Sequence, residues 1–98
     1  MEQIWKLVVE ILVKPGGMKS GLTKGFMNAT TWATSAPVAT EKLKKYIERF
    51  NWHIISIEDA RAVEDDEEFD EPINDMIART RVNPNAIILG TFHGYKEV

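Results

Sequence analysis

Apolar residues recur at every second position along the N-terminal segment, and this period predicts a β-strand with one buried face. The apolar set consists of Trp5, Leu7, Val9, Ile11 and Val13. The alternate set is mixed and consists of Lys6, Val8, Glu10 and Leu12. After a glycine-rich stretch, β-type residues resume over 25–34, so we expect a second strand that pairs with the first across a flexible loop at 14–25.

The next segment has a helical period. Ser35 is a suitable N-cap, because its hydroxyl can accept a hydrogen bond from a free amide of the first turn, and Pro37 is tolerated in that turn. Apolar residues then recur at offsets of three and four, which places them on one stripe of a helix that ends at Asn51. The stripe consists of Ala39, Leu43, Tyr46, Ile47 and Phe50.

Three further elements complete the chain. The β-branched run at 52–58 predicts a strand, with Ile55 and Ile57 on its core side. Pro72 suits the first turn of a second helix, and the sequence Asn-Pro-Asn at 83–85 ends that helix. Residues 86–95 are expected to form one closing strand.

The predicted order is therefore ββαβαβ within one α+β domain that spans residues 1–98. A two-layer sandwich is the economical arrangement, with a four-stranded, mostly antiparallel sheet and two helices on one face. The segment 32–57 is expected to be a right-handed strand–helix–strand crossover whose two strands run parallel. This topology resembles the ferredoxin-like and related split βαβ domains, although no helix is predicted between the first two strands.

Composition excludes several classes of protein. Apolar residues make up 44% of the 98 residues, which is too many for a disordered chain. The chain has no cysteine, so it has no disulfide framework, no zinc–thiolate site and no cysteine nucleophile, and we expect a cytoplasmic protein. The N-terminal apolar run is about half the ~20 residues of a membrane helix and lacks the positive leader of a signal peptide, so no membrane association is expected.

Charge is distributed unevenly along the chain. Residues 1–50 carry a balance of +4 and residues 51–98 a balance of −7. Seven carboxylates occupy the eight positions 64–71, and we interpret them as a solvated leader to the positive end of the second helix, anchored by Phe69. The electrostatic docking candidates are Lys14, Lys19 and Lys24 in the loop, and Glu64, Asp65, Asp66, Glu67 and Glu68 in the acidic run.

No pattern of residues indicates catalysis, a cofactor or a metal. The loop at 14–25 lacks the Walker spacing and precedes a strand rather than a helix. A calcium loop needs a glycine at its sharp turn, and no glycine lies between Asn51 and Leu89. His53 and His93 are the only histidines, and two imidazoles without a third ligand make a poor metal site.

The aromatic residues provide the strongest candidates for a binding surface. If Met27, Ala29, Thr31 and Ala33 face the helices, the alternate residues of that strand face the opposite side of the sheet. The interface or ligand candidates on this helix-free face are Phe26, Trp32, Trp52, His93 and Tyr95. A contiguous exposed apolar area usually marks an interface or ligand site. Two alternatives would remove this exposed surface. The loop at 14–25 could fold over the aromatic residues, or the strand register could differ by one residue from the one assumed.

Three functions remain open. The first is a small protein-interaction module that forms a homodimer or binds a protein partner through the helix-free aromatic face. The alternative is a small-molecule-binding protein or small enzyme with a pocket at that face. The third is single-stranded nucleic-acid binding. It is disfavoured by the sequence pI of 5.3 and by the charge balance of −7 in residues 51–98, which would repel phosphates.

Overall fold

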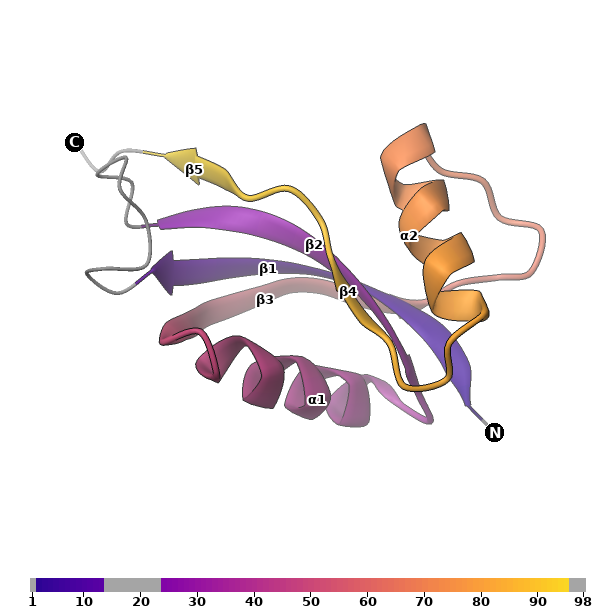
Figure 1. Cartoon of the computed structure of the whole chain (residues 1–98), viewed down its shortest axis with the longest axis horizontal. Coiled ribbons are helices and arrows are strands. Elements are labelled where there is room, and N and C mark those ends of the chain that lie inside the picture. Colours follow the sequence, from indigo (N-terminus) through magenta and orange to yellow (C-terminus); the bar gives the residue numbers. More distant parts are fainter. Residues whose placement is uncertain (1, 14–23, 96–98) are drawn as a thin grey trace.

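A computed structural model describes residues 2–13 and 24–95, and Figure 1 shows the arrangement of its elements. The elements are β1 (Gln3–Val13), β2 (Lys24–Ala33), α1 (Ala36–Glu48), β3 (Trp52–Ala62), α2 (Glu71–Arg81), β4 (Ile87–Leu89) and β5 (His93–Tyr95). The predicted docking residues Lys14 and Lys19 lie outside the described residues.

The predicted α+β class and the order ββαβαβ are confirmed. The sheet is antiparallel throughout and has the strand order β3-β1-β2-β4, with β5 also paired to β2. Because β2 and β3 are both antiparallel to β1, they run parallel to each other on either side of it. The segment from β2 through α1 to β3 is therefore a split βαβ unit, and the prediction that its two strands run parallel is confirmed.

The main core forms where α1 covers one face of the central strands. Most of the odd-numbered residues of β1 predicted to be buried are confirmed, since Leu7, Val9 and Ile11 have no exposed area, whereas Trp5 is half-buried. Met27, Ala29 and Ala33 of β2 face the same side and pack with Leu43 and Ile47 of α1. The helix starts as predicted, because the Ser35 hydroxyl accepts a hydrogen bond from the Val38 amide at 3.4 Å.

The second helix corrects the predicted arrangement, because the two helices do not share one face of the sheet. Helix α2 packs against Ile4 and Trp32, which alternate with the β1 and β2 residues that face α1. It is also joined to Thr30 through a hydroxyl pair with Thr80 at 2.7 Å. Alternate side chains of a strand point to opposite faces, so α2 covers part of the face that we predicted to be free of helices.

Strand β3 corrects a second prediction, the placement of Ile55 on the core side. Its pairing with β1 shifts register at two points, between Val8 and Val9 and between Glu10 and Ile11. Each bulge inserts an extra residue and reverses the alternation beyond it. Ile54 and Ile57 therefore pack against the main core, whereas Ile55 is 43% exposed.

The predicted closing strand at 86–95 is divided into β4 and β5. The backbone leaves the ladder at Gly90, where the Gly90 amide still donates to the Asn28 carbonyl at 2.8 Å. Phe92 then turns toward the main core cluster and packs against it. In the described part of the chain, neither helix has the length and apolar character needed to cross a membrane.

Candidate functional site

Among the predicted aromatic candidates, Trp52 lies on the opposite side of the sheet from Trp32 and Phe26. Trp32 lies beside α2, and its indole Nε1 donates to the Thr80 carbonyl at 2.7 Å. Trp52 lies on the other side of the sheet, in the α1 layer. Phe26 pairs with His93 across β2 and β5, so these two side chains share a face. Tyr95 ends β5 opposite Lys24 in the backbone ladder.

The part of that face beyond α2 is mostly polar. Phe26 is 36% exposed there, and Val8 and Leu12 are half-buried. The cross-strand neighbours of Val8 and Leu12 in β2 and β3 are Lys24, Asn28, His53 and Asp59. Polar residues on the solvated side of an antiparallel sheet are the ordinary pattern. On this part of the face, polar and charged side chains therefore lie next to Val8 and Leu12.

A row of aromatic rings instead follows the C-terminal end of α1. Tyr46 contacts Phe50 edge to face at 5.3 Å, Phe50 contacts Trp52 at 5.4 Å, and Trp52 contacts Phe92 at 6.4 Å between ring centroids. Phe50 was predicted to lie in the buried stripe, but it follows the helix end and is 44% exposed. This row of rings connects the C-terminal end of α1 to the segment before β5.

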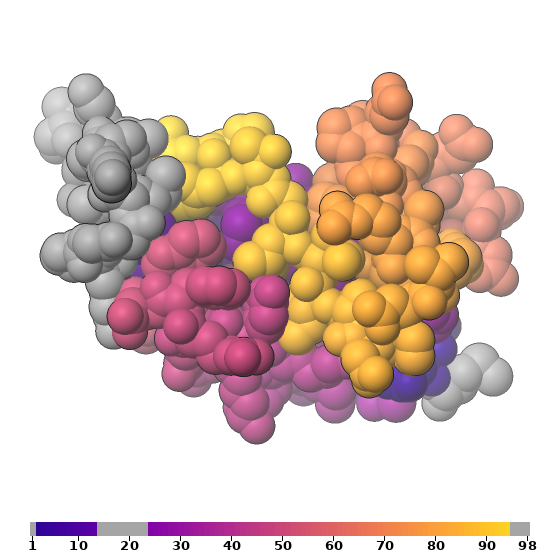
Figure 2. All heavy atoms as spheres, in the orientation of Figure 1, coloured from indigo at the N-terminus to yellow at the C-terminus, as the bar shows by residue number. Residues whose placement is uncertain are grey.

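A groove lies between α1 and β4, next to this row. Figure 2 shows α1, in magenta to pink, beside the orange-yellow β4 segment on the surface of the molecule. The groove has a volume of about 260 Å³. We call it the α1 groove, and its lining residues are Lys42, Lys45, Tyr46, Arg49 and Ile87.

The α1 groove is cationic, because three of its lining residues are basic and none is acidic. Lys42 is held in place, since its ammonium donates to the Trp32 carbonyl at 2.6 Å. Lys45 is largely exposed and lies 3.8 Å from Glu41, a weak surface pair. Arg49 has no ion-pair partner among the residues that the structure describes. The groove thus offers positive charge around a tyrosine ring and an aliphatic side chain.

The sequence analysis did not predict this groove, although the spacing of its helical lining residues is visible in the sequence. Lys42, Lys45, Tyr46 and Arg49 follow the offsets of three and four that place residues on one side of a helix. Ile87 lines the groove only because β4 pairs with β2, and no local sequence pattern predicts that pairing.

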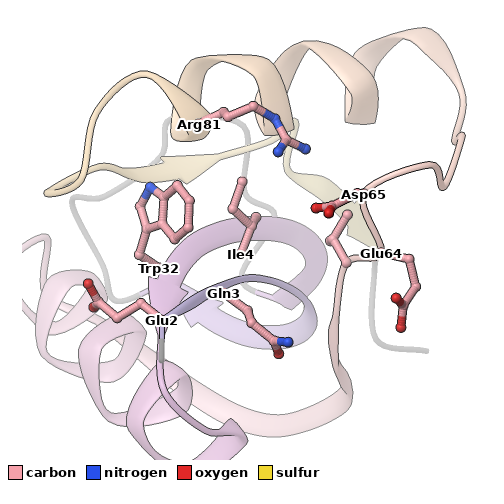
Figure 3. A pocket seen from close by; sticks show the side chains of 8 residues that line it. Glu2, Gln3, Ile4, Trp32, Glu64, Asp65 and Arg81 are labelled. Carbon is pink, nitrogen blue, oxygen red and sulfur yellow. The ribbon is translucent and has the colours of Figure 1, made fainter.

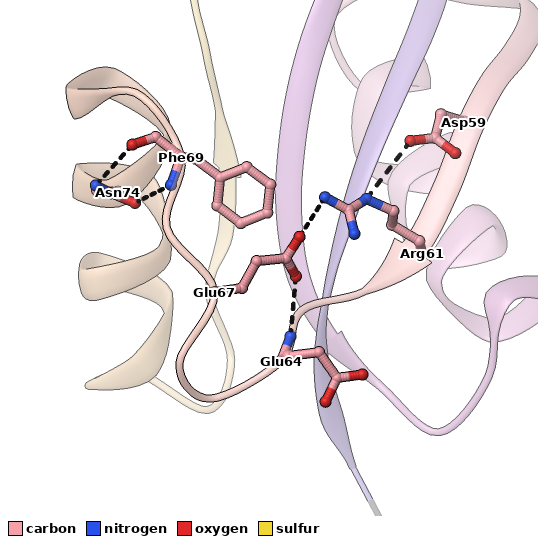
Figure 4. Close-up of polar contacts among 6 residues, drawn as sticks. All are labelled: Asp59, Arg61, Glu64, Glu67, Phe69 and Asn74. Carbon is pink, nitrogen blue, oxygen red and sulfur yellow. Dashed lines mark hydrogen bonds and ion pairs between the residues drawn. The ribbon is translucent and has the colours of Figure 1, made fainter.

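The acidic run forms a defined turn on the other side of the molecule. The Glu67 amide donates to the Glu64 carbonyl at 3.2 Å, and the Glu64 amide donates to Glu67 Oε1 at 3.2 Å. Asp65 and Asp66 occupy the tip and are exposed. We call residues 64–67 the acidic turn. Figure 4 shows how its base is held against the end of β3.

Two contacts fix the base of the acidic turn. The Glu67 carboxylate pairs with the Arg61 guanidinium at 2.5 Å. Beyond it, Phe69 packs into the second core cluster, and its ring lies under Arg61 at 5.1 Å and Lys6 at 5.7 Å. The predicted anchoring role of Phe69 agrees with this placement. Asp70 accepts from the Ile73 amide at 3.3 Å and caps α2.

The acidic turn is expected to loosen in acid. The hydrogen bond from the Glu64 amide, together with the Arg61 charge, lowers the pKa of Glu67 below its ordinary value. A lowered folded-state pKa means that this contribution to stability is present above the usual glutamate pKa of about 4.3 and is lost as the pH falls through the lowered pKa. In urea unfolding, the stability difference between wild type and Glu67→Gln should therefore shrink on acidification.

The neighbouring Glu68→Gln is the matched control, because Glu68 is exposed and forms no ion pair among the described residues. Its stability difference from wild type should stay small across the same pH range. An NMR titration that places the Glu67 midpoint at or above the usual glutamate pKa of about 4.3 would contradict the pKa direction.

The described residues also line two further hollows. The first, of about 210 Å³, is shown in Figure 3, where Trp32 and Ile4 form one wall and Arg81 lies across from Asp65. The second, of about 540 Å³, lies between α2 and the β4–β5 segment and includes Asn28 and His93. Its Arg79 is paired with Asp75 at 3.8 Å.

The described residues contain no group of three or more histidine, cysteine or acidic side chains placed to hold a metal ion. Comparison with protein-family models, with curated proteins and with solved structures gives no match for this chain.

Proposed function

We propose that this protein is a protein-interaction module that binds an acidic segment of a partner protein in the α1 groove. The observation that carries the proposal is the lining itself, three cations around Tyr46 and Ile87 with no acidic residue among them. Carboxylates of a bound segment would meet Lys45 and Arg49, and an apolar side chain would lie against Ile87. The groove replaces the helix-free face as the proposed interaction surface, because α2 packs over Trp32 on that face and Trp52 lies on the α1 side.

The chemistry of the groove favours an acidic peptide over a nucleic acid. Nucleic-acid binding needs a basic footprint that extends over several phosphates. The α1 groove is about 260 Å³ in volume, and the half of the chain after residue 50 carries a balance of −7. An acidic peptide needs only local positive charge and a place for an apolar side chain.

Charge reversal in the groove is expected to weaken binding of an acidic peptide about tenfold. The probe is a fluorescein-labelled octapeptide of alternating glutamate and leucine, and the measurement is fluorescence anisotropy. The test variant is Lys45→Glu with Arg49→Glu, which replaces two attractive charges with repulsive ones. Each exposed charge pair is worth up to about 1 kcal/mol, and about 1.4 kcal/mol corresponds to a tenfold change in affinity.

Lys44→Glu is the matched control, because Lys44 is exposed on the same helix but does not line the groove. It should change the affinity less than threefold, as expected from screened long-range charge alone. If Lys44→Glu weakens binding as much as the groove variant, the attraction is nonspecific and the proposal fails. Tighter binding of a single-stranded oligonucleotide than of the peptide would assign the groove to nucleic acid instead.

A further inference from the structure

The chain carries an acidic element with the chemistry that the α1 groove requires. The tip of the acidic turn exposes Asp65 and Asp66, and neither forms an ion pair among the described residues. The turn is held in shape from below by the Glu67–Arg61 pair and by the bond from the Glu64 amide. A segment that is already ordered loses little conformational entropy when it docks.

The acidic turn cannot reach the groove of its own chain. Val63 and Phe69, which flank the turn, pack into the second core cluster with α2. Ile87 and the buried side of α1 belong to the main cluster on the opposite face of the sheet. Figure 1 shows the turn at the far right of the view and α1 at the lower left, with the sheet between them. Each copy therefore presents the two charged surfaces separately.

We propose that the occupant of the α1 groove is the acidic turn of a second copy of this chain. The inference rests on the proposed function and adds the identity of the partner. The lining is cationic and the tip of the turn is anionic, so contact between copies pairs Lys45 and Arg49 of one with Asp65 and Asp66 of the other. The contact either closes as a two-fold pair or continues head to tail.

Association through these surfaces is weak and sensitive to salt. Exposed ion pairs contribute little each, and the groove is small beside the interface of a stable dimer. The Debye screening length falls from about 10 Å at 0.1 M salt to about 3 Å at 1 M salt, so the attraction between the two surfaces is lost at high ionic strength. The average mass of the full chain in sedimentation velocity should rise with protein concentration at low salt and return to the monomer mass at high salt.

The decisive test mixes two charge-reversed variants. The groove variant carries Lys45→Glu and Arg49→Glu, and the turn variant carries Asp65→Lys and Asp66→Lys. Each alone should remain monomeric at low salt, because both of its surfaces then have the same sign. An equimolar mixture should associate again, because each variant supplies the surface that the other lacks. All four positions are exposed, so circular dichroism should show the wild-type fold in both variants.

A control variant with Glu58→Lys and Asp75→Lys raises the net charge by four, as the turn variant does, at exposed sites outside both surfaces, and it should associate like wild type. A wild type that stays monomeric at low salt while its groove binds the acidic octapeptide would overturn the self-association but leave the proposed function standing. If the wild type neither associates at low salt nor binds the acidic octapeptide, both the self-association and the proposed function are rejected. Association that survives charge reversal at either surface would place the contact elsewhere and overturn the inference.

Discussion

Leu7→Ala should destabilise the fold by about 2–5 kcal/mol, the range for removing a fully buried leucine side chain. Leu7 has no exposed area and belongs to β1, which lies between β2 and β3 in the sheet. Its side chain packs in the cluster that α1 closes, so the cavity cannot collapse without moving a helix or a neighbouring strand. Small domains have total stabilities of about 5–15 kcal/mol, so the loss is readily measured by urea unfolding.

Leu12→Ala is the matched control in the same strand. Leu12 is half-buried and points to the opposite face, beyond α2. The same substitution removes less buried surface there and should cost about 1 kcal/mol. If Leu12→Ala were as destabilising as Leu7→Ala, the face beyond α2 would be covered in solution, and the polar character that we assign to it would be wrong.

Thr80→Val should destabilise the fold by about 1–3 kcal/mol, because it leaves a buried hydroxyl without a good partner. The Thr80 hydroxyl donates to the Met76 carbonyl at 2.8 Å, so the Thr30 hydroxyl must donate to Thr80 at 2.7 Å. Without Thr80, the remaining acceptor for Thr30 is the Met76 carbonyl at 3.4 Å. Both threonines are fully buried between β2 and α2, where water cannot replace the lost bond.

The double variant Thr30→Val with Thr80→Val should cost less than the sum of the single variants. Replacing both partners removes the hydroxyls together and leaves none of the pair unsatisfied. A double-mutant cycle by urea unfolding measures this coupling. If the destabilisations of the two single variants add within about 0.5 kcal/mol, the hydroxyls do not touch. That result would contradict the packing of α2 on this face of the sheet.

The position of α2 decides which surfaces remain for binding. Had both helices covered one face, Trp32 would have been exposed on the other, as the sequence interpretation expected. Because α2 lies on that face, the Trp32 indole packs against it and donates a hydrogen bond to the Thr80 carbonyl. The α1 groove combines charge with an aromatic ring, and it lies on the side where α1 and the edge strand β4 leave a gap.

The sequence determined most of the fold through local patterns. Alternation in β1 identified its buried residues, and the spacing around Leu43, with Ser35 as the cap, identified α1. Such patterns are informative because strand and helix periods are properties of short segments. The acidic turn was likewise visible as a solvated run with Phe69 as its anchor, since charge and burial preference are set by composition alone.

Only the tertiary structure decided how these elements face one another. The bulges in β3 exposed Ile55, because an extra residue reverses the faces of a strand without changing its composition. The side of the sheet that α2 occupies depends on long-range contacts with Thr30 and Trp32, which no local period encodes. The α1 groove also needs Ile87 from a distant strand, and the separation of basic and acidic surfaces onto opposite faces follows from that packing.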